Sequence, residues 1–504
     1  YTIDGRGQEF LELVGGLEEL KQQGVGSRDF ALTRFFPNGK TKRIVPRAIG
    51  APEDDDNDNS NGKTANGGKT KTSPAVPERF WIPRSVFVSL LYEMAQKHFR
   101  GKINVHLSTE CLSIEKRKHE DASEETLEVV ARRCDGKNNS SGGNELKSFS
   151  PNLLVGCDGL NSVVRKALVN WDGDGEDSGY NVVEYPSLSS GLRFKVLNLP
   201  PSFYLDHQCK MRAANNEAYV FVGARRRRSE NLRLGLLPIR DKDAPRTANF
   251  ITAVEDHKIW NVRSGEEMID YLGKTFPQIP IRSIVTLEEA ERFARSTGGR
   301  FPSPQYSERF QKVLQGGNHG VVLMGDALHA FPPDLGQGVN AGLQDVMVLR
   351  QALMKHSGIS ESLPWFERER LPDVRALIRL MQVGYPLQYS QAPFRQRLWS
   401  IKLTFQLAMH KVLPSLFYKP LTMNVGNVKL RYRDILCYAE RNARRVQVGA
   451  MLMGLVSAVT LAFKCSAFRP FWVPPLMAIA LPALVIRMTY QKSPLSTMNE
   501  AANA

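Results

Sequence analysis

The sequence predicts an α/β protein with a doubly wound, three-layer domain, an inserted and mostly antiparallel β domain, and C-terminal helices that include a membrane segment. Two strand–turn–helix segments, at residues 153–165 and 321–353, indicate the first domain. Short segments that alternate apolar and polar residues, between about 180 and 300, are typical of an antiparallel sheet. A chain of 504 residues exceeds what one hydrophobic core usually serves, so we expect several domains.

The elements divide the chain into consecutive parts. The first part contains a helical apolar pattern at 8–23, a polar tract at about 52–74 and a helix that begins near Arg84. Because the polar tract cannot bury apolar surface, we expect it to be a disordered insertion. The predicted parts are residues 1–175 and 306–360 for the doubly wound domain, 176–305 for the β-rich substrate domain, 361–445 for a helical region, and 446–488 for hydrophobic membrane segments.

Residues 321–345 carry the pattern that points most directly to a ligand. Four apolar residues suit a buried strand, Gly325 and Asp326 follow, and Asn340 opens a helical pattern that includes Leu349 and Leu353. Glycines allow the backbone to approach a ligand closely, and a helix N-terminus offers unpaired N–H groups to an anion. Asp326 is placed to accept hydrogen bonds from a polyol. This segment therefore predicts a site for a phosphorylated or electron-rich cofactor.

The C-terminal region has a different composition. Residues 446–463 are apolar apart from Gln447 and Ser457, residues 471–486 are wholly apolar, and basic residues flank both stretches. At about 1.5 Å per residue the first stretch spans roughly 27 Å, close to the thickness of a bilayer core. We expect it to be a membrane segment, because basic flanks are typical of the interface. A buried core helix is the alternative interpretation.

Charge and cysteine content limit the possible partners. The formal net charge is +15, but no nucleic-acid-binding module is recognisable, so we expect no nucleic acid partner. A cationic channel for a pyridine nucleotide and an anionic membrane surface are the expected sources of this charge. The six cysteines are scattered without metal-ligand spacing, which predicts no metal site, no disulfide framework and a reducing, intracellular environment.

Two motifs resemble those of the FAD-dependent aromatic hydroxylases. The segment GDALHAFPPDLGQGVNAGLQD, which begins at Gly325, is similar to the GD motif of that family. The segment Asp158-Gly159, followed by Ser162 and Arg165, resembles its DG motif. The resemblance implies FAD as cofactor and NAD(P)H as co-substrate, with Asp326 at the ribityl chain, the GQG-x-N segment beside the flavin ring, and the DG motif between the two nucleotides.

The resemblance also implies a set of site residues. Pro333 would shape the face of the flavin, and no catalytic acid or base is strictly required. His329 is interpreted as structural. The implied cofactor-binding residues are Arg84, Cys111, Asp158, Gly159, Arg165, Gly325, Asp326, Gly336, Gln337, Gly338, Val339 and Asn340.

A glycine fingerprint that this family uses for the ADP half of FAD is not found in the chain. Residues 1–8 look like the segment that follows such a unit. We therefore expect an N-terminally truncated sequence, and a degenerate protein without flavin is the alternative. The resemblance implies an FAD-binding fold for the doubly wound domain.

Within the family, the chain most resembles the kynurenine 3-monooxygenase branch and its plant- and alga-type relatives. By approximate alignment Arg47 is the candidate for holding the substrate, and Pro333, Asp334 and Leu335 replace the aromatic loop of that branch. The substrate expected is thus an aromatic or lipophilic small molecule, hydroxylated with NAD(P)H and O2 through a C4a-hydroperoxyflavin. A flavin-dependent reductase and a non-catalytic remnant are the alternatives. The resemblance implies a membrane-anchored protein, at the mitochondrial outer membrane, and leaves the oligomeric state open.

Overall fold

The computed structural model describes residues 1–28, 31–44, 78–118, 124–134, 146–173, 175–224, 232–252, 254–383 and 393–466. The chain separates into two compact units, one of residues 1–403 and 422–433, the other of residues 404–421 and 434–504. Each unit is described by itself below. The predicted insertion at 52–74 and the candidate substrate residue Arg47 lie outside the described residues.

The N-terminal part of the first unit is a small antiparallel sheet with three helices. The sheet order is β1-β5-β2. Asp4 caps the first helix, because its Oδ1 accepts from the Arg6 N–H at 2.9 Å, and Gly15 ends that helix in the left-handed conformation. Ile3, Leu11 and Phe87 belong to the apolar core between these elements. The elements are β1 (Thr2–Ile3), α1 (Gly5–Val14), α2 (Leu17–Gln23), β2 (Val25–Gly26), β5 (Phe80–Trp81) and α3 (Arg84–His98).

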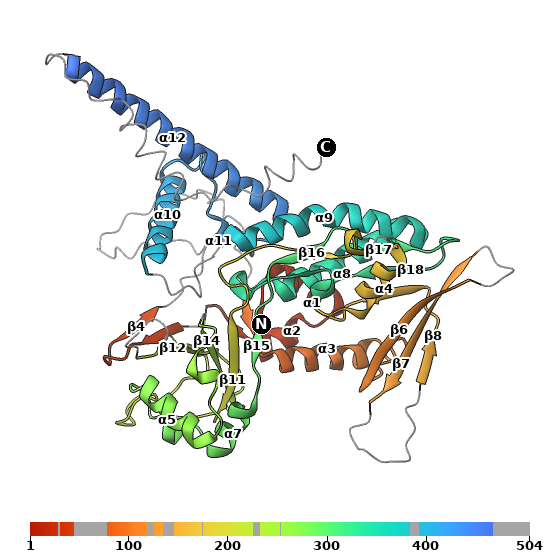
Figure 1. The fold of residues 1–504 in the computed structure, drawn as a ribbon, viewed down its shortest axis with the longest axis horizontal. Coiled ribbons are helices and arrows are strands. Elements are labelled where there is room, and N and C mark those ends of the chain that lie inside the picture. The colour runs from red at the N-terminus through yellow and green to blue at the C-terminus, as the bar shows by residue number, and fades with distance from the viewer. Residues whose placement is uncertain are drawn as a thin grey trace, which may run out of the picture. The chain divides into compact units, whose positions relative to one another are not determined.

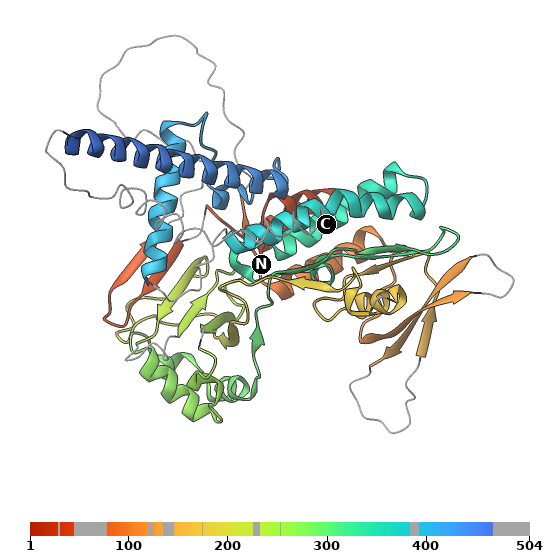
Figure 2. The same ribbon diagram turned by 45° about the horizontal axis from the view of Figure 1, so that its top comes forward.

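The two strand–turn–helix segments predicted from the sequence lie side by side. β9 (Leu153–Gly156) pairs in parallel with β18 (Gly320–Leu323), and β17 (Gln311–Val313) pairs antiparallel on the other side of β18. All four residues of β18 are buried. The helices that follow are α4 (Val163–Asp172), α8 (Gly338–Lys355) and α9 (Ile359–Val383), and α8 and α9 run together in both views (Figures 1 and 2).

A seven-stranded sheet forms the β-rich part of the first unit. Its order is β15-β11-β14-β13-β12-β3-β4, antiparallel except where β12 pairs in parallel with β3. Residues 31–44 therefore join a sheet that the sequence pattern assigned to residues 176–305 alone. The strands are β3 (Ala31–Phe35), β4 (Thr41–Ile44), β11 (Arg193–Leu199), β12 (Glu217–Val222), β13 (Arg233–Leu236), β14 (Arg246–Thr252) and β15 (Gly299–Arg300).

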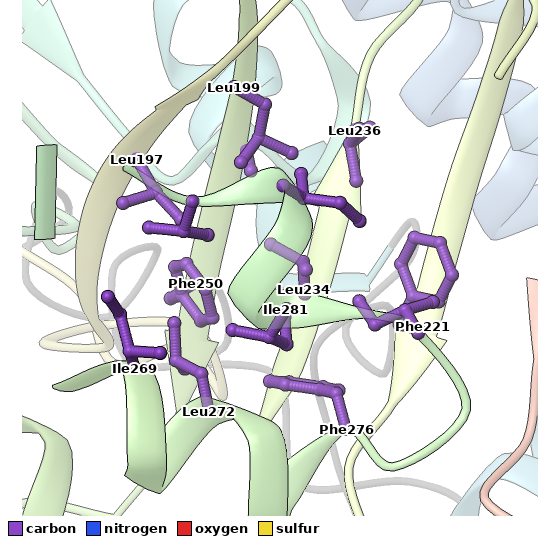
Figure 3. Packing of buried hydrophobic residues seen from close by; sticks show 14 of the residues in the cluster. Leu197, Leu199, Phe221, Leu234, Leu236, Phe250, Ile269, Leu272, Phe276 and Ile281 are labelled. Carbon is purple, nitrogen blue, oxygen red and sulfur yellow. The ribbon is translucent and has the colours of Figure 1, made fainter. Parts of the chain in front are cut away.

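Helices cover one face of this sheet and enclose its core. Ser264 and Thr286 cap α5 (Gly265–Thr275) and α7 (Leu287–Arg295) by accepting from the N–H three residues ahead, and α6 (Ile281–Ile284) lies between them in the chain. Figure 3 shows the packing: Phe250 and Phe276 face apolar side chains from the strands and from α5 and α6.

Two further sheets complete the first unit. β6 (Thr109–Lys118), β7 (Glu125–Arg133) and β8 (Leu146–Phe149) form an antiparallel sheet that projects from the body in Figure 1. β10 (Val182–Glu184), β16 (Gln305–Ser307) and β19 (His329–Ala330) form another. Short 3-10 turns lie at Gly175–Asp177, Lys258–Trp260, Gly325–Ala327 (η4) and Pro333–Leu335 (η5).

The remaining helices are α10 (Pro393–Val412), α11 (Leu421–Asn424) and α12 (Tyr432–Ser466). Within the second unit Tyr418 stacks on Tyr438, with ring centroids 4.2 Å apart. The Asn442 side-chain amide makes two hydrogen bonds with the Tyr418 backbone: its Oδ1 accepts from the Tyr418 N–H, and its Nδ2 donates to the Tyr418 carbonyl. In the part of the chain that the structure describes, none of the helices has the length and apolar composition needed to cross a bilayer. The membrane segment predicted at 446–488 is thus not supported, and residues 467–488 lie outside the described part.

Candidate functional site

The loop after β18 makes a sharp turn, and a hydrogen bond to a residue of α8 holds it in place. Gly325 has φ 58°, a left-handed conformation, and open space where a side chain would be. Its N–H donates to Asp345 Oδ2 at 2.8 Å. The η4 turn therefore presents its backbone outward while α8 holds it in place.

A buried charge cluster anchors this loop. Asp345 and Arg370 are fully buried, and Arg370 Nε donates to Asp345 Oδ1 at 2.6 Å. His329 Nε2 lies 2.9 Å from the other carboxylate oxygen. Burial alone would raise the pKa of the Asp345 carboxyl, but His329, Arg370 and the Gly325 N–H outweigh it and lower that pKa to about 2. The loop thus rests on a permanently ionised carboxylate.

The start of α8 offers unpaired donors. Gly336 turns the chain with φ 63°, and the helix begins at Gly338 without a side-chain cap. Among the described residues, the N–H groups of Gly338 and Val339 have no hydrogen-bond acceptor. Apart from its chain neighbours and the backbone of its own helix, no described residue lies within 4 Å of the position where a Gly338 Cβ would stand. This end of the helix can therefore accept an electron-rich group at close range.

Asp326 and Arg84 bring opposite charges to the same region. Both side chains are exposed, and neither has a hydrogen-bond or ion-pair partner in the described part of the chain. Surrounding protein still raises the pKa of the Asp326 carboxyl by desolvation, while His329 and Arg84 lower it. Arg84 is thus close enough to influence Asp326 electrostatically, which joins the start of α3 to the GD loop.

The polar residues of the DG motif mainly make hydrogen bonds within the protein. The Asp158 carboxylate accepts from the N–H groups of Val163 and Val164 at 2.6 and 3.1 Å, so it caps α4. Arg165 Nη1 donates to the carbonyl of Ala327 at 2.6 Å and thereby ties this motif to the GD loop. Cys111 lies close enough to Asp158 for that charge to affect its thiol, whose pKa is raised first by burial.

Gln337 and Asn340 are buried and bonded to the N-terminal segment. Asn340 Oδ1 accepts from the Asp4 N–H at 3.0 Å, and its Nδ2 donates to the Thr2 carbonyl at 2.8 Å. Gln337 Nε2 donates to Asp4 Oδ2 at 2.9 Å, and Tyr432 donates to Gln337 Oε1 at 2.8 Å. Both amides are engaged with the protein, so they shape the start of α8 and leave its backbone to a ligand.

The structure therefore brings most of the predicted site residues to one region and separates their roles. Among the described residues, Arg84, Asp326 and the Gly338 N–H have no hydrogen-bond partner. Asp158, Arg165, Gln337 and Asn340 instead make hydrogen bonds that hold the loops. Gly159 has φ 79° in the turn before α4, and Val339 packs on the core beside α1. Pro333 is exposed at the start of η5.

Sequence reasoning missed three residues of this region. Asp345 and Arg370 form the cluster beneath the GD loop, and Asp334 is a buried carboxylate in η5. A signal for Asp345 was present, since it lies five residues after Asn340 on the helical face that includes Ala341 and Leu349. Nothing local could reveal Arg370, because its partner lies 25 residues away on another helix.

These features fit the cofactor that the sequence resemblance implies. A flavin nucleotide carries a polyol, which needs acceptors such as Asp326, and an electron-poor ring with carbonyl oxygens, which needs donors such as the Gly338 and Val339 N–H groups. The open space at Gly325 and Gly338 allows backbone approach. The residues present thus match the donor and acceptor groups of FAD on the ribityl and ring side.

Comparisons with known proteins point the same way. A family model described as an FAD binding domain matches residues 305–380. Kynurenine 3-monooxygenase of Salinispora arenicola is 26% identical over 339 residues, 65% of this chain and 64% of that protein. The enzyme of the same name from Sus scrofa is 30% identical over 148 residues, 29% of this chain and 31% of that protein. The chain thus aligns with less than two thirds of either relative.

Solved structures resemble this chain at lower sequence identity. Klebsiella pneumoniae HpxO complexed with FAD and uric acid has a TM-score of 0.46 and 17% identity, covering 80% of this chain and 82% of that one. The matched FAD binding domain and these relatives show that the chain is similar to FAD-dependent monooxygenases and carries part of an FAD binding domain.

Proposed function

We propose that the protein is an FAD-dependent monooxygenase that uses NAD(P)H and O2 to hydroxylate an aromatic or lipophilic small molecule. The observation that carries the proposal is the paired arrangement of the GD loop and the start of α8. There an uncommitted carboxylate at Asp326 and unpaired N–H groups at Gly338 and Val339 are held by a buried ionic cluster. A scaffold without a ligand has no need of this combination.

The residues of this chain have distinct tasks in such an enzyme. When bound, FAD supplies the redox chemistry and the activation of oxygen. Asp326 accepts hydrogen bonds from the polyol, and the first turn of α8 donates to the ring edge. Arg84 lies beside Asp326 and adds positive charge near the cofactor. Asp345 and Arg370 hold the loop in one conformation, which would lower the ordering cost of binding FAD.

The test is to purify the gene product and measure its bound flavin, then its NADPH and NADH oxidation with a panel of aromatic compounds, with and without O2. We expect stoichiometric FAD and substrate-stimulated, oxygen-dependent oxidation with a hydroxylated product. Turnover that proceeds equally without O2 would instead identify a flavin-dependent reductase. Absence of both flavin and nucleotide oxidation would refute the proposal and favour a non-catalytic protein.

Asp326→Ala makes the test specific for the site. Losing a hydrogen bond to a charged group costs about 1.5–3 kcal/mol, so we expect FAD to bind roughly ten-fold or more weakly. The matched control is Asp256→Ala, an exposed aspartate in the β-rich part of the chain, which should leave FAD affinity unchanged. Equal FAD affinity in both variants would remove Asp326 from the site.

A further inference from the structure

One carboxylate near the site is buried without a counter-ion. Asp334 lies in η5, is 6% exposed, and accepts a hydrogen bond from Ser189 Oγ at 2.8 Å on its Oδ1. In the described part of the chain no donor contacts its second oxygen, Oδ2. No charged side chain of the described residues affects it, and burial raises the pKa of this carboxyl to about 6. Above that pH a negative charge is held here at a cost to folding.

Asp345, at the other end of the same segment, shows what a structural carboxylate requires in this protein. It is more completely buried than Asp334, yet an arginine, a histidine and a backbone N–H surround it. Asp334 has one neutral hydroxyl instead. Asp334 Oδ2 is not one of the fully enclosed polar atoms that lack a partner, so this oxygen is accessible from outside the protein and can accept a hydrogen bond from a ligand.

Two features fix the position of Asp334: the η5 turn that contains it and the hydrogen bond from Ser189. It lies four residues before Gly338, in the turn that leads directly to the unpaired start of α8. Ser189 reaches it from the connection between β10 and β11, where the Ser187 hydroxyl accepts from the Ser189 N–H at 3.3 Å and lies 2.9 Å from the Ser190 hydroxyl. The carboxylate is therefore held where the connection between β10 and β11 meets the turn that leads into α8.

We propose that Asp334 Oδ2 accepts a hydrogen bond from an O–H or N–H group of the substrate, and that Ser189 is the residue that positions it. The substrate would be an aromatic compound with a hydroxyl or amino substituent at this point, and a carboxylate there would be rejected by like charge. This inference rests on the proposed monooxygenase function. It names the group that the substrate must present and a residue that selects for it.

The experiment compares three probes that differ only in the group presented: phenol, its methyl ether anisole, which has no donor, and benzoate. Binding is measured by titration calorimetry on the purified protein, after its flavin content has been determined. We expect phenol to bind at least ten-fold more tightly than anisole at pH 8 and benzoate not to bind. The phenol affinity should fall as the pH drops through about 6, because the protonated acid is a poorer acceptor.

Two variants test whether Asp334 and Ser189 cause the preference for phenol over anisole. Asp334→Leu should abolish the preference for phenol over anisole, and Ser189→Ala should reduce it and shift its pH dependence. Asp256→Asn is the exposed control and should change neither. A preference for phenol that survives in Asp334→Leu, or equal binding of phenol and anisole to the unmodified protein, would overturn the inference.

A stability measurement keeps the inference testable even if a variant binds nothing. Because the folded pKa of Asp334 is raised, its penalty is absent below the unfolded pKa and present above about 6. Asp334→Asn should therefore raise the melting temperature at pH 8 but not at pH 4. No gain at pH 8 would show that the charge is already compensated in the free protein. Flavin-free protein would refute the proposed function, whereas a missing phenol preference in flavin-loaded protein would refute only the role of Asp334.

Discussion

The buried pair of Asp345 and Arg370 provides the sharpest prediction for stability. Arg370→Met keeps most of the side-chain volume but removes three donors, at 2.6 Å to Asp345, 3.0 Å to Gln344 and 3.1 Å to the Ala341 carbonyl. Asp345 then remains ionised with only the Gly325 N–H and His329 as partners. Breaking a buried pair on one side costs about 3–5 kcal/mol, so we expect a loss in that range.

The loss should be local, in α8 and α9, where both partners lie. Amide hydrogen exchange followed by mass spectrometry measures the free energy of opening of these helices directly. A loss of 3–5 kcal/mol corresponds to exchange faster by roughly two to four orders of magnitude. The matched control is Arg375→Met in the same helix, where the half-exposed arginine pairs with Glu308 at the surface. That ion pair is worth at most about 1 kcal/mol.

The reasoning fails if exchange in Arg370→Met is less than ten-fold faster than in Arg375→Met. A second variant separates the buried charge from the lost packing. Adding Asp345→Asn to Arg370→Met removes the unpaired charge and should restore part of the protection, because the amide still accepts from the Gly325 N–H. No recovery in the double variant would assign the loss to packing instead.

Three further predictions concern the same scaffold. The folded pKa of Asp345 is lowered to about 2, so its ionised carboxylate stabilises the fold above about pH 4, and this stabilisation is lost as the pH falls toward 2. The drop in melting temperature caused by acid should therefore be smaller in Asp345→Asn than in the unmodified protein. Gly325→Ala should cost about 1–2 kcal/mol in urea denaturation and lower the flavin content, because φ is 58°, whereas Gly273→Ala in α5 should stabilise slightly. Gly156→Ala places a Cβ 2.8 Å from Val164 Cβ, so overpacking should reduce the free energy of unfolding by about 1–3 kcal/mol.

Local sequence patterns predicted the strand, loop and helix of residues 321–353 better than they predicted how the strands pair in the sheets. The strand, loop and helix at 321–353 were recognisable because each has its own periodicity and turn residues, and the structure places them as β18, η4 and α8. Leu353 was expected on the buried face of that helix but is 41% exposed. The helix instead turns Asn340, Ala341 and Asp345 inward, because polar contacts rather than apolar burial fix its first turns.

Long-range pairing explains most of what the sequence could not reveal. β3 joins the seven-stranded sheet through a parallel register in which Ala31 pairs with Glu217. No short-range pattern encodes a partner nearly two hundred residues away, so residues 31–44 were grouped with residues 1–175 and not with this sheet. The same limit hid Arg370 and the role of Arg165, whose donor bond reaches the Ala327 carbonyl across 162 residues.

The two buried acids of the GD segment show how structure separates support from function where sequence cannot. Asp334 and Asp345 are eleven residues apart, and either could have been interpreted as a ligand-binding carboxylate from its residue type alone. Burial is common to both, so it does not distinguish them. The two acids differ in how far the surrounding groups compensate their negative charge. The pKa of Asp345 falls to about 2 because hydrogen-bond donors and a cation surround it. The pKa of Asp334 rises to about 6 because burial disfavours its charge and such groups are missing around it. A carboxylate whose charge is fully compensated has no free acceptor for a substrate, and one whose charge is not compensated is stabilised by binding a donor. Asp334 is therefore the carboxylate of this segment that can still accept a hydrogen bond from a ligand.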